Sequence, residues 1–136
     1  MIKQEIQDYY LWNTKKIQTA VSKPKNVKCG YIYWTKIGKN IGCEVFGKNA
    51  NFTRPVLVLK RIDLQKSLFL GIPLSSKLKN NPYSYIFKDS KGRFQNALLD
   101  QIRIFDTRRI LSRCANIDKT ELKNIASKIS VYILAE

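Results

Sequence analysis

The stretch Phe52-Thr53-Arg54-Pro55-Val56-Leu57-Val58-Leu59-Lys60 decides how this sequence folds. Its apolar run from Pro55 to Leu59 predicts a β-strand that is buried on both faces. Pro55 has no N–H to donate to a sheet ladder, so we expect it at the start of the strand. Arg54 then lies at the mouth of the strand, with a fixed backbone and a guanidinium that reaches solvent. The planar guanidinium, with its five N–H donors, is suited to bind a phosphate. If Arg54 is considered by itself, however, a surface ion pair is the simpler interpretation.

Further short strands are predicted on both sides of this stretch. Alternating or apolar runs predict them near residues 29–37, 67–74, 82–88 and 93–105, the last as one long strand or two with a possible bulge near 97–99. Residues 38–51 hold three glycines and three asparagines without periodicity, and they predict a long loop. In the run at 93–105, Asp100 would share a face with Ile102 and Ile104. A carboxylate there is costly unless it is paired, so a structural ion pair and a catalytic role are equally open for Asp100.

A helix is predicted at each end of the chain. Residues 2–22 carry an apolar stripe at helical spacing, and Pro24 ends that helix. Near the C-terminus, Asp118 as N-cap and Glu121 three residues later predict the start of a second helix. A short helical turn is expected at 107–113. We therefore predict a mainly β (α+β) chain of five to seven short antiparallel strands curled into a small barrel, with terminal helices.

Composition limits the function further. The chain has 136 residues with 25 Lys and Arg against 10 Asp and Glu, a net charge of +15 that favours polyanionic partners. It has no histidine, which excludes His-dependent triads and the commonest zinc ligand. Its three cysteines lack a CxxC pairing, and no apolar run is long enough for a membrane helix. A reducing cytoplasm is the expected location, with no membrane association.

Several blocks of residues resemble the MazF/PemK toxins of type II toxin–antitoxin systems. The blocks are Gly30-Tyr31-Ile32-Tyr33-Trp34, Ile41-Gly42-Cys43-Glu44, Arg54-Pro55-Val56-Leu57-Val58, Gly71-Ile72-Pro73-Leu74-Ser75-Ser76-Lys77 and Asp100-Gln101-Ile102-Arg103-Ile104-Phe105-Asp106. They occur in order at suitable spacing from about Gly30 onward. The resulting division is an N-terminal helix and linker at 1–28 and a MazF/PemK-like domain at 29–136.

The resemblance implies a compact SH3-like antiparallel β-barrel of the CcdB/PemK type, with the N-terminal helix as an addition. It also implies a homodimeric endoribonuclease that cleaves single-stranded RNA, including mRNA, without a metal or other cofactor. A cognate antitoxin with an acidic tail would neutralise it. Two alternatives stay open: a non-catalytic toxin of the CcdB type, which poisons DNA gyrase, and an inactive relative that only binds RNA or antitoxin.

Catalytic and substrate-binding residues follow from the same resemblance. Arg54, Ser75 and Asp100 are the expected catalytic residues. Ser75 stands where relatives carry Thr, and Leu98 stands where some relatives carry a second Arg. Because that Arg would pair with Asp100, its absence favours a mechanism based on Arg54 and Ser75 over one based on Asp100. The expected substrate-binding residues are Glu44, Phe52, Ser76, Lys77, Gln101 and Arg103. For Glu44, Gln101 and Arg103 a structural contact is the competing interpretation, and for Phe52 it is a place in the core.

Overall fold

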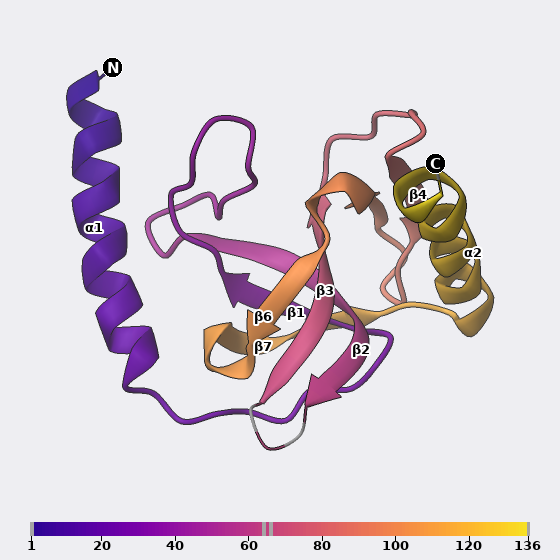
Figure 1. Ribbon diagram of the computed structural model, residues 1–136, viewed down its shortest axis with the longest axis horizontal. Helices are drawn as coiled ribbons and strands as arrows, with labels where there is room; N and C mark the ends of the chain where they lie inside the picture. Colours follow the sequence, from indigo (N-terminus) through magenta and orange to yellow (C-terminus); the bar gives the residue numbers. More distant parts are fainter. Residues whose placement is uncertain (1, 64, 66, 136) are drawn as a thin grey trace.

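The computed structural model describes residues 2–63, 65 and 67–135 of the chain. Helix α1 (Ile2–Ala20) lies along one flank, and helix α2 (Lys119–Ile129) lies on the opposite flank (Figure 1). Between them is a seven-stranded sheet with the order β4-β5-β3-β2-β1-β7, in which β6 also pairs with β3. The strands are β1 (Tyr31–Lys36), β2 (Thr53–Asp63), β3 (Leu68–Ser75), β4 (Ser84–Lys88), β5 (Phe94–Leu98), β6 (Arg103–Asp106) and β7 (Ile110–Asn116).

All ladders in this sheet are antiparallel, which confirms the mainly β architecture with a helix at each end. No ladder among the described residues joins β4 to β7, so closure into a complete barrel stays a prediction. The two edges meet at the turn that follows β4. There, the Ser90 N–H donates to the carbonyl of Asn116, and the Asn116 N–H donates to Ser90 Oγ.

The apolar run in β2 is buried on both faces, as its composition predicts. Val56, Leu57 and Val58 have no exposed surface. Leu57 belongs to a core cluster with Ile72 and Ile125 of α2, whereas Val56 and Val58 belong to a second cluster with Phe69 and Phe105. Burial of each such side chain is worth about 1.5–3 kcal/mol. This two-sided core fixes β2, the strand that carries Arg54.

Two local predictions are wrong in detail. β2 begins at Thr53 rather than at Pro55, because Thr53 and Arg54 pair with Lys36 and Thr35 of β1. Of the two alternatives at 93–105, two strands are present, and a 3-10 helix, η1 (Leu99–Gln101), separates them where a bulge was considered. Asp100 therefore lies in an exposed turn and not on the face of an apolar strand.

The C-terminal part also departs from expectation. The helical turn predicted at 107–113 is only the 3-10 helix η2 (Thr107–Arg109), after which the chain continues as β7, the partner of β1. Asp118 is the N-cap of α2, accepting from the Thr120 N–H at 3.2 Å. A five-residue π-helix (Ser130–Leu134) extends α2. None of the described helices is both long enough and apolar enough to cross a membrane.

Candidate functional site

Arg54 is the most constrained polar side chain at the centre of the sheet. Its Nε donates to the Phe46 carbonyl and its Nη1 to the Leu74 carbonyl, each at 3.0 Å. The residue is only 9% exposed, so the expectation of a guanidinium that extends into solvent is wrong, and burial lowers the pKa of the guanidinium. Two of the five guanidinium N–H groups are used in these bonds, so three remain for a ligand.

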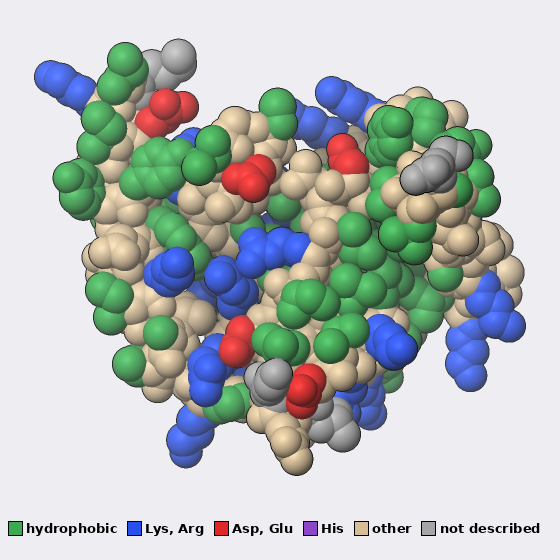
Figure 2. Space-filling view, in the orientation of Figure 1, with side chains coloured by type: hydrophobic (Ala, Val, Ile, Leu, Met, Phe, Trp, Pro, Cys, Tyr) green, Lys and Arg blue, Asp and Glu red, His purple; other side chains and the backbone are tan. Residues whose placement is uncertain are grey.

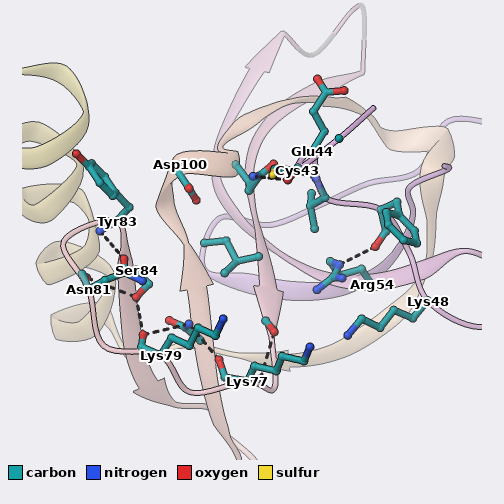
Figure 3. A pocket seen from close by; sticks show the side chains of 17 residues that line it. Cys43, Glu44, Lys48, Arg54, Lys77, Lys79, Asn81, Tyr83, Ser84 and Asp100 are labelled. Atoms are coloured by element: carbon teal, nitrogen blue, oxygen red, sulfur yellow. Dashed lines mark hydrogen bonds between the residues drawn. The ribbon is translucent and has the colours of Figure 1, made fainter. Parts of the chain in front are cut away.

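Ser75 lies beside this guanidinium because it follows Leu74 at the end of β3. Its Oγ accepts a hydrogen bond from the Lys77 N–H at 3.2 Å. That bond uses the oxygen as an acceptor and leaves the hydroxyl proton free to donate elsewhere. Both Arg54 and Ser75 line a groove of about 510 Å³ (Figure 3).

The groove is bounded by three segments that are distant in sequence. The loop before β2 contributes Glu44 and Lys48, the loop after β3 contributes Lys77 and Lys79, and η1 contributes Asp100. In Figure 3, Lys48 and Lys77 extend toward the same open space as Arg54, and Asp100 lies across from them. Four cationic and two acidic side chains line the groove, which gives a net charge of +2. The groove therefore suits an anionic chain that lies along it.

Asp100 is free to act on a ligand in this groove. Its side chain is exposed, and it has no hydrogen-bond or ion-pair partner in the described part of the chain. The neighbouring Gln101 has a different position: its Oε1 accepts from the Val45 N–H at 3.0 Å, and its Nε2 donates to the Cys43 carbonyl at 3.2 Å. Gln101 thus fastens the loop before β2 to η1.

The other expected substrate-binding residues are distributed over several surfaces. Ser76 lies in a second hollow that shares Arg54 and Ser75 with the groove. Arg103 lies in an adjoining hollow with Glu44; burial lowers the pKa of Arg103, and the Glu44 charge acts in the opposite direction. Glu44 Oε1 also accepts from the Ile41 N–H within its own loop.

Phe52 does not line the groove. It is 6% exposed, and its ring packs against Trp12 of α1 with 5.6 Å between the ring centroids. The structure therefore places this side chain at the junction between α1 and the sheet. Phe46, by contrast, is half-buried on the groove wall, with Lys39 Nζ 4.2 Å from its ring centroid.

Sequence reasoning did not identify several groove residues. Asn96 is buried under the loop after β3, and its Nδ2 donates to the carbonyls of Lys77 and Lys79 at 3.1 and 3.4 Å. Lys128 of α2 donates to the carbonyls of Asn81 and Ser84 in the same loop. In the sequence, residues 64–88 contain four Lys and no Asp or Glu, and this uneven charge is the signal for the basic loop. Other unanticipated groove residues are Lys48, Lys79, Asn81 and Tyr83.

Comparison with known proteins places the chain in a family. Among solved structures, it resembles MazF from Deinococcus radiodurans (TM-score 0.65, 20% identity, covering 84% of this chain and 100% of that one). It also resembles the Mycobacterium tuberculosis toxin MazF-mt6 (TM-score 0.58, 10% identity, 78% and 98% covered). A third is an endoribonuclease from a mycobacterial species in complex with its cognate antitoxin (TM-score 0.59, 10% identity, 82% and 98% covered).

At these identities the structural matches show the fold alone. A search of curated proteins finds no significant match. The sequence profile of the PemK-like, MazF-like toxins of type II toxin–antitoxin systems matches residues 28–133, which is well over half of the chain. The chain therefore belongs to the PemK-like, MazF-like toxin family.

Proposed function

We propose that this chain is an endoribonuclease toxin that cleaves single-stranded RNA by attack of a ribose 2′-hydroxyl on the adjacent phosphate, without a metal ion. One observation carries the proposal. The Arg54 guanidinium is anchored on two backbone carbonyls, beside the Ser75 hydroxyl, in a groove of net positive charge. A fixed cation next to a hydroxyl donor is suited to the extra negative charge that develops on a pentacoordinate phosphate.

Three side chains take part in the reaction. Asp100 accepts the proton of the 2′-hydroxyl, and the 2′-oxygen forms a bond to phosphorus. Arg54 and Ser75 donate hydrogen bonds to the phosphate oxygens as charge builds on them. The bond from phosphorus to the 5′-oxygen breaks, that oxygen takes up a proton from a solvent water molecule, and Asp100 returns its own proton to the solvent. The products are a 2′,3′-cyclic phosphate and a 5′-hydroxyl end.

The lysines on the groove walls bind the RNA backbone on either side of the scissile phosphate. Lys48 comes from the loop before β2, and Lys77 and Lys79 come from the loop that Asn96 and Lys128 hold in place. Phe46 lines the same groove and supplies a ring on which an unpaired base can stack. Because bases are paired and stacked in a duplex, this arrangement favours single-stranded substrate.

The partners follow from the family and from two of the related structures. MazF from Deinococcus radiodurans was crystallised with MazE, and the mycobacterial endoribonuclease with its cognate antitoxin. For this chain we expect an antitoxin with an acidic tail that occupies the basic groove and excludes RNA. We expect the toxin to act in the cytoplasm as a homodimer. Competition between RNA and a synthetic acidic tail for the purified toxin tests whether the tail occupies the groove.

Incubation of the purified protein with single-stranded RNA in EDTA tests the nuclease assignment. We expect cleavage with 2′,3′-cyclic phosphate and 5′-hydroxyl ends, and a reduced rate for Ser75→Ala. Ser75→Thr, which restores the residue type of relatives, should cleave at least as fast as the native chain. Ser127→Ala on the exposed surface of α2 is the matched control. RNA that stays intact would favour the CcdB-type or the inactive alternative.

Salt dependence of RNA binding provides a second measurement. Each phosphate contact to single-stranded RNA is expected to contribute about 0.7 to the slope of log affinity against log salt. Replacing Lys77 or Lys79 by Gln should therefore lower the slope by about this amount in a cleavage-deficient background. A flat salt response would contradict a polyanion ligand in the groove.

A further inference from the structure

Helix α1 packs on the rest of the molecule through a narrow polar and aromatic side, not through its apolar stripe. Trp12 and Thr19, the two buried residues of α1, lie about 20° apart at 100° per residue. Trp12 contacts Phe52 and Gly38, and the Tyr9 hydroxyl donates to the Asn40 carbonyl at 2.9 Å. These contacts fix which side of the helix faces the sheet.

The apolar stripe consequently faces away from the molecule. On the helical wheel Tyr10 and Ile17 lie about 160° and 140° from Trp12. Figure 2 shows hydrophobic side chains along the outer edge of α1, the helix at the left of the view. The exposed fractions of the stripe residues are 73% for Ile2, 50% for Ile6, 73% for Tyr10, 59% for Ile17 and 82% for Val21. A contiguous apolar surface of this kind indicates an interaction site.

The spacing of the outer residues identifies the partner. Ile6, Tyr10 and Ile17 of the stripe, together with Asn13, follow steps of four, three and four, and Lys3 and Ala20, next to Ile2 and Val21, continue this spacing at each end. These steps are those of the a/d repeat of a two-stranded coiled coil. The repeat is symmetric about its centre, because 6 and 17, 10 and 13, and 3 and 20 all sum to 23. In an antiparallel pair of identical helices, Ile6 therefore faces Ile17, and Tyr10 faces Asn13, on both sides of a two-fold axis.

We propose that α1 pairs in an antiparallel manner with α1 of a second copy of this chain. The inference goes beyond the proposed nuclease function and does not depend on it. Residues 2–20 lie outside the part of the chain that the toxin family profile matches. The pairing is an additional interface specific to the N-terminal helix.

Charge favours a second copy over an acidic partner. Residues 2–20 hold three Lys, one Glu and one Asp, a net charge of +1, so the rest of the chain carries +14 of the total of +15. An acidic segment is attracted to the rest of the chain rather than to this nearly neutral stripe. The last turn of α1 has no basic residue of its own. In the antiparallel register Lys3 of the second copy lies opposite Ala20, where its charge meets the negative end of the helix dipole.

The central layer accounts for Asn13, which is one of the two polar residues at these six positions; the other is Lys3. Asn13 is exposed on α1, and in the register above its amide lies opposite the Tyr10 hydroxyl of the second copy. A polar residue at one core position of a coiled coil selects a single register. A helix of 19 residues is about 28 Å long, so the contact is at the small end of stable interfaces. We expect reversible association that depends on concentration.

Disulfide trapping tests the register. In a background in which the exposed Cys29 and Cys43 are replaced by Ser, Ile6→Cys and Ile17→Cys are prepared as two separate proteins. Mixed and oxidised gently, they should form the 6–17 heterodisulfide. Each protein alone should not crosslink, because two copies of residue 6 are about 16 Å apart along the axis, beyond disulfide reach. Homodisulfides at 6 or 17, or no heterodisulfide, would overturn the proposal.

Solution mass supplies an independent measurement on the full chain. Ile6→Asp/Ile17→Asp places charges in the seam and should weaken concentration-dependent association at least tenfold by analytical ultracentrifugation. Gln4→Asp/Gln18→Asp makes the same charge change on exposed positions away from the stripe, and should associate like the native chain. Far-UV circular dichroism checks that both variants keep their helices.

Other occupants of the stripe give different results. Equal association of the two variants overturns the proposal. The proposal is also overturned if, at every toxin concentration, α1 is protected from hydrogen exchange only when antitoxin or vesicles of anionic phospholipid are added. Because no readout uses RNA cleavage, failure of this inference is distinguishable from failure of the nuclease assignment.

Discussion

Arg54 Nη1 donates a hydrogen bond to the carbonyl oxygen of Leu74 at 3.0 Å, across the β2–β3 ladder. The peptide bond that carries this oxygen leads directly to Ser75. One hydrogen bond therefore fixes the guanidinium relative to the hydroxyl, although the two residues are 21 positions apart in the sequence. The second anchor, from Arg54 Nε to the Phe46 carbonyl, attaches the loop before β2 to the same point.

Replacement of Arg54 should affect activity and stability together. Arg54→Lys keeps a charge but cannot bond both carbonyls and a phosphate, so we expect RNA cleavage to fall by about a hundred- to thousandfold. Arg54→Ala leaves two buried carbonyls without a donor and should also lower the free energy of unfolding by about 1–3 kcal/mol. Initial cleavage rates and urea unfolding measure the two effects.

Arg61→Lys is the matched control for these variants, because Arg61 is an exposed residue of the same strand. It should change neither quantity appreciably. Native cleavage by Arg54→Lys would contradict the role given to the guanidinium.

The part of the fold that sequence reasoning predicted is the part encoded by local patterns. The apolar run 55–59 can be buried only between two layers, so β2 follows from composition, although Arg54 is its second residue and does not precede it. Ser75 follows from the end of the next apolar strand. The N-cap at Asp118 is likewise a local signal.

The parts that sequence reasoning missed depend on contacts between distant residues. The pattern around residues 97–99 allows a break between two strands, but nothing in it signals that the chain turns through a 3-10 helix that carries Asp100. Residues 110–116 form β7 because they pair with the free edge of β1. The local sequence of these residues does not reveal this pairing. The orientation of α1 depends on the fit of Trp12 against Gly38, and an apolar stripe normally predicts the inner side of a helix.

We expect Gln101 mainly to hold the loop before β2 in place. Gln101→Ala removes the bonds to the Val45 N–H and the Cys43 carbonyl, and each is worth about 0.5–1.5 kcal/mol. We expect faster hydrogen exchange at the Val45 amide, measured by mass spectrometry of peptides from 41–48, with less change elsewhere. Gln65→Ala, at an exposed position far from this loop, is the control. Unchanged exchange with weakened RNA binding would instead make Gln101 a substrate contact.

Asp89 should make stability depend on acid pH. Burial, the largest single influence, raises the pKa of Asp89, but hydrogen bonds from the Gln95 side chain and the Arg93 and Lys91 N–H groups, together with the Arg93 charge, hold the pKa below its ordinary value. A lowered pKa in the folded state stabilises the fold above the unfolded pKa of about 3.9. This stability is lost as the pH falls through the folded pKa.

Asp89→Asn should therefore be less stable than the native chain near pH 7, and the difference should shrink below about pH 4. Urea unfolding at a series of pH values measures the difference. Asp100→Asn changes an exposed carboxylate without partners among the described residues, so its stability should follow that of the native chain at each pH. A difference for Asp89→Asn that persists at low pH would assign its effect to shape rather than to charge.

Gly38 should control whether α1 stays docked on the sheet. A Cβ added at this position would lie 1.7 Å from Trp12 Cε2, so Gly38→Ala forces the indole away from Phe52. The backbone of Gly38 is not in the left-handed region, so the steric clash with Trp12 is the main cost. We expect α1 to detach while the sheet persists, with faster proteolysis at Lys15, Lys16 and Lys23. Gly42→Ala adds a methyl that meets no atom within 4 Å; its positive φ of 58° strains only its own loop, so this variant should leave α1 protected. If Gly38→Ala unfolds the sheet together with α1, the helix is a part of the core and not an appended docking element.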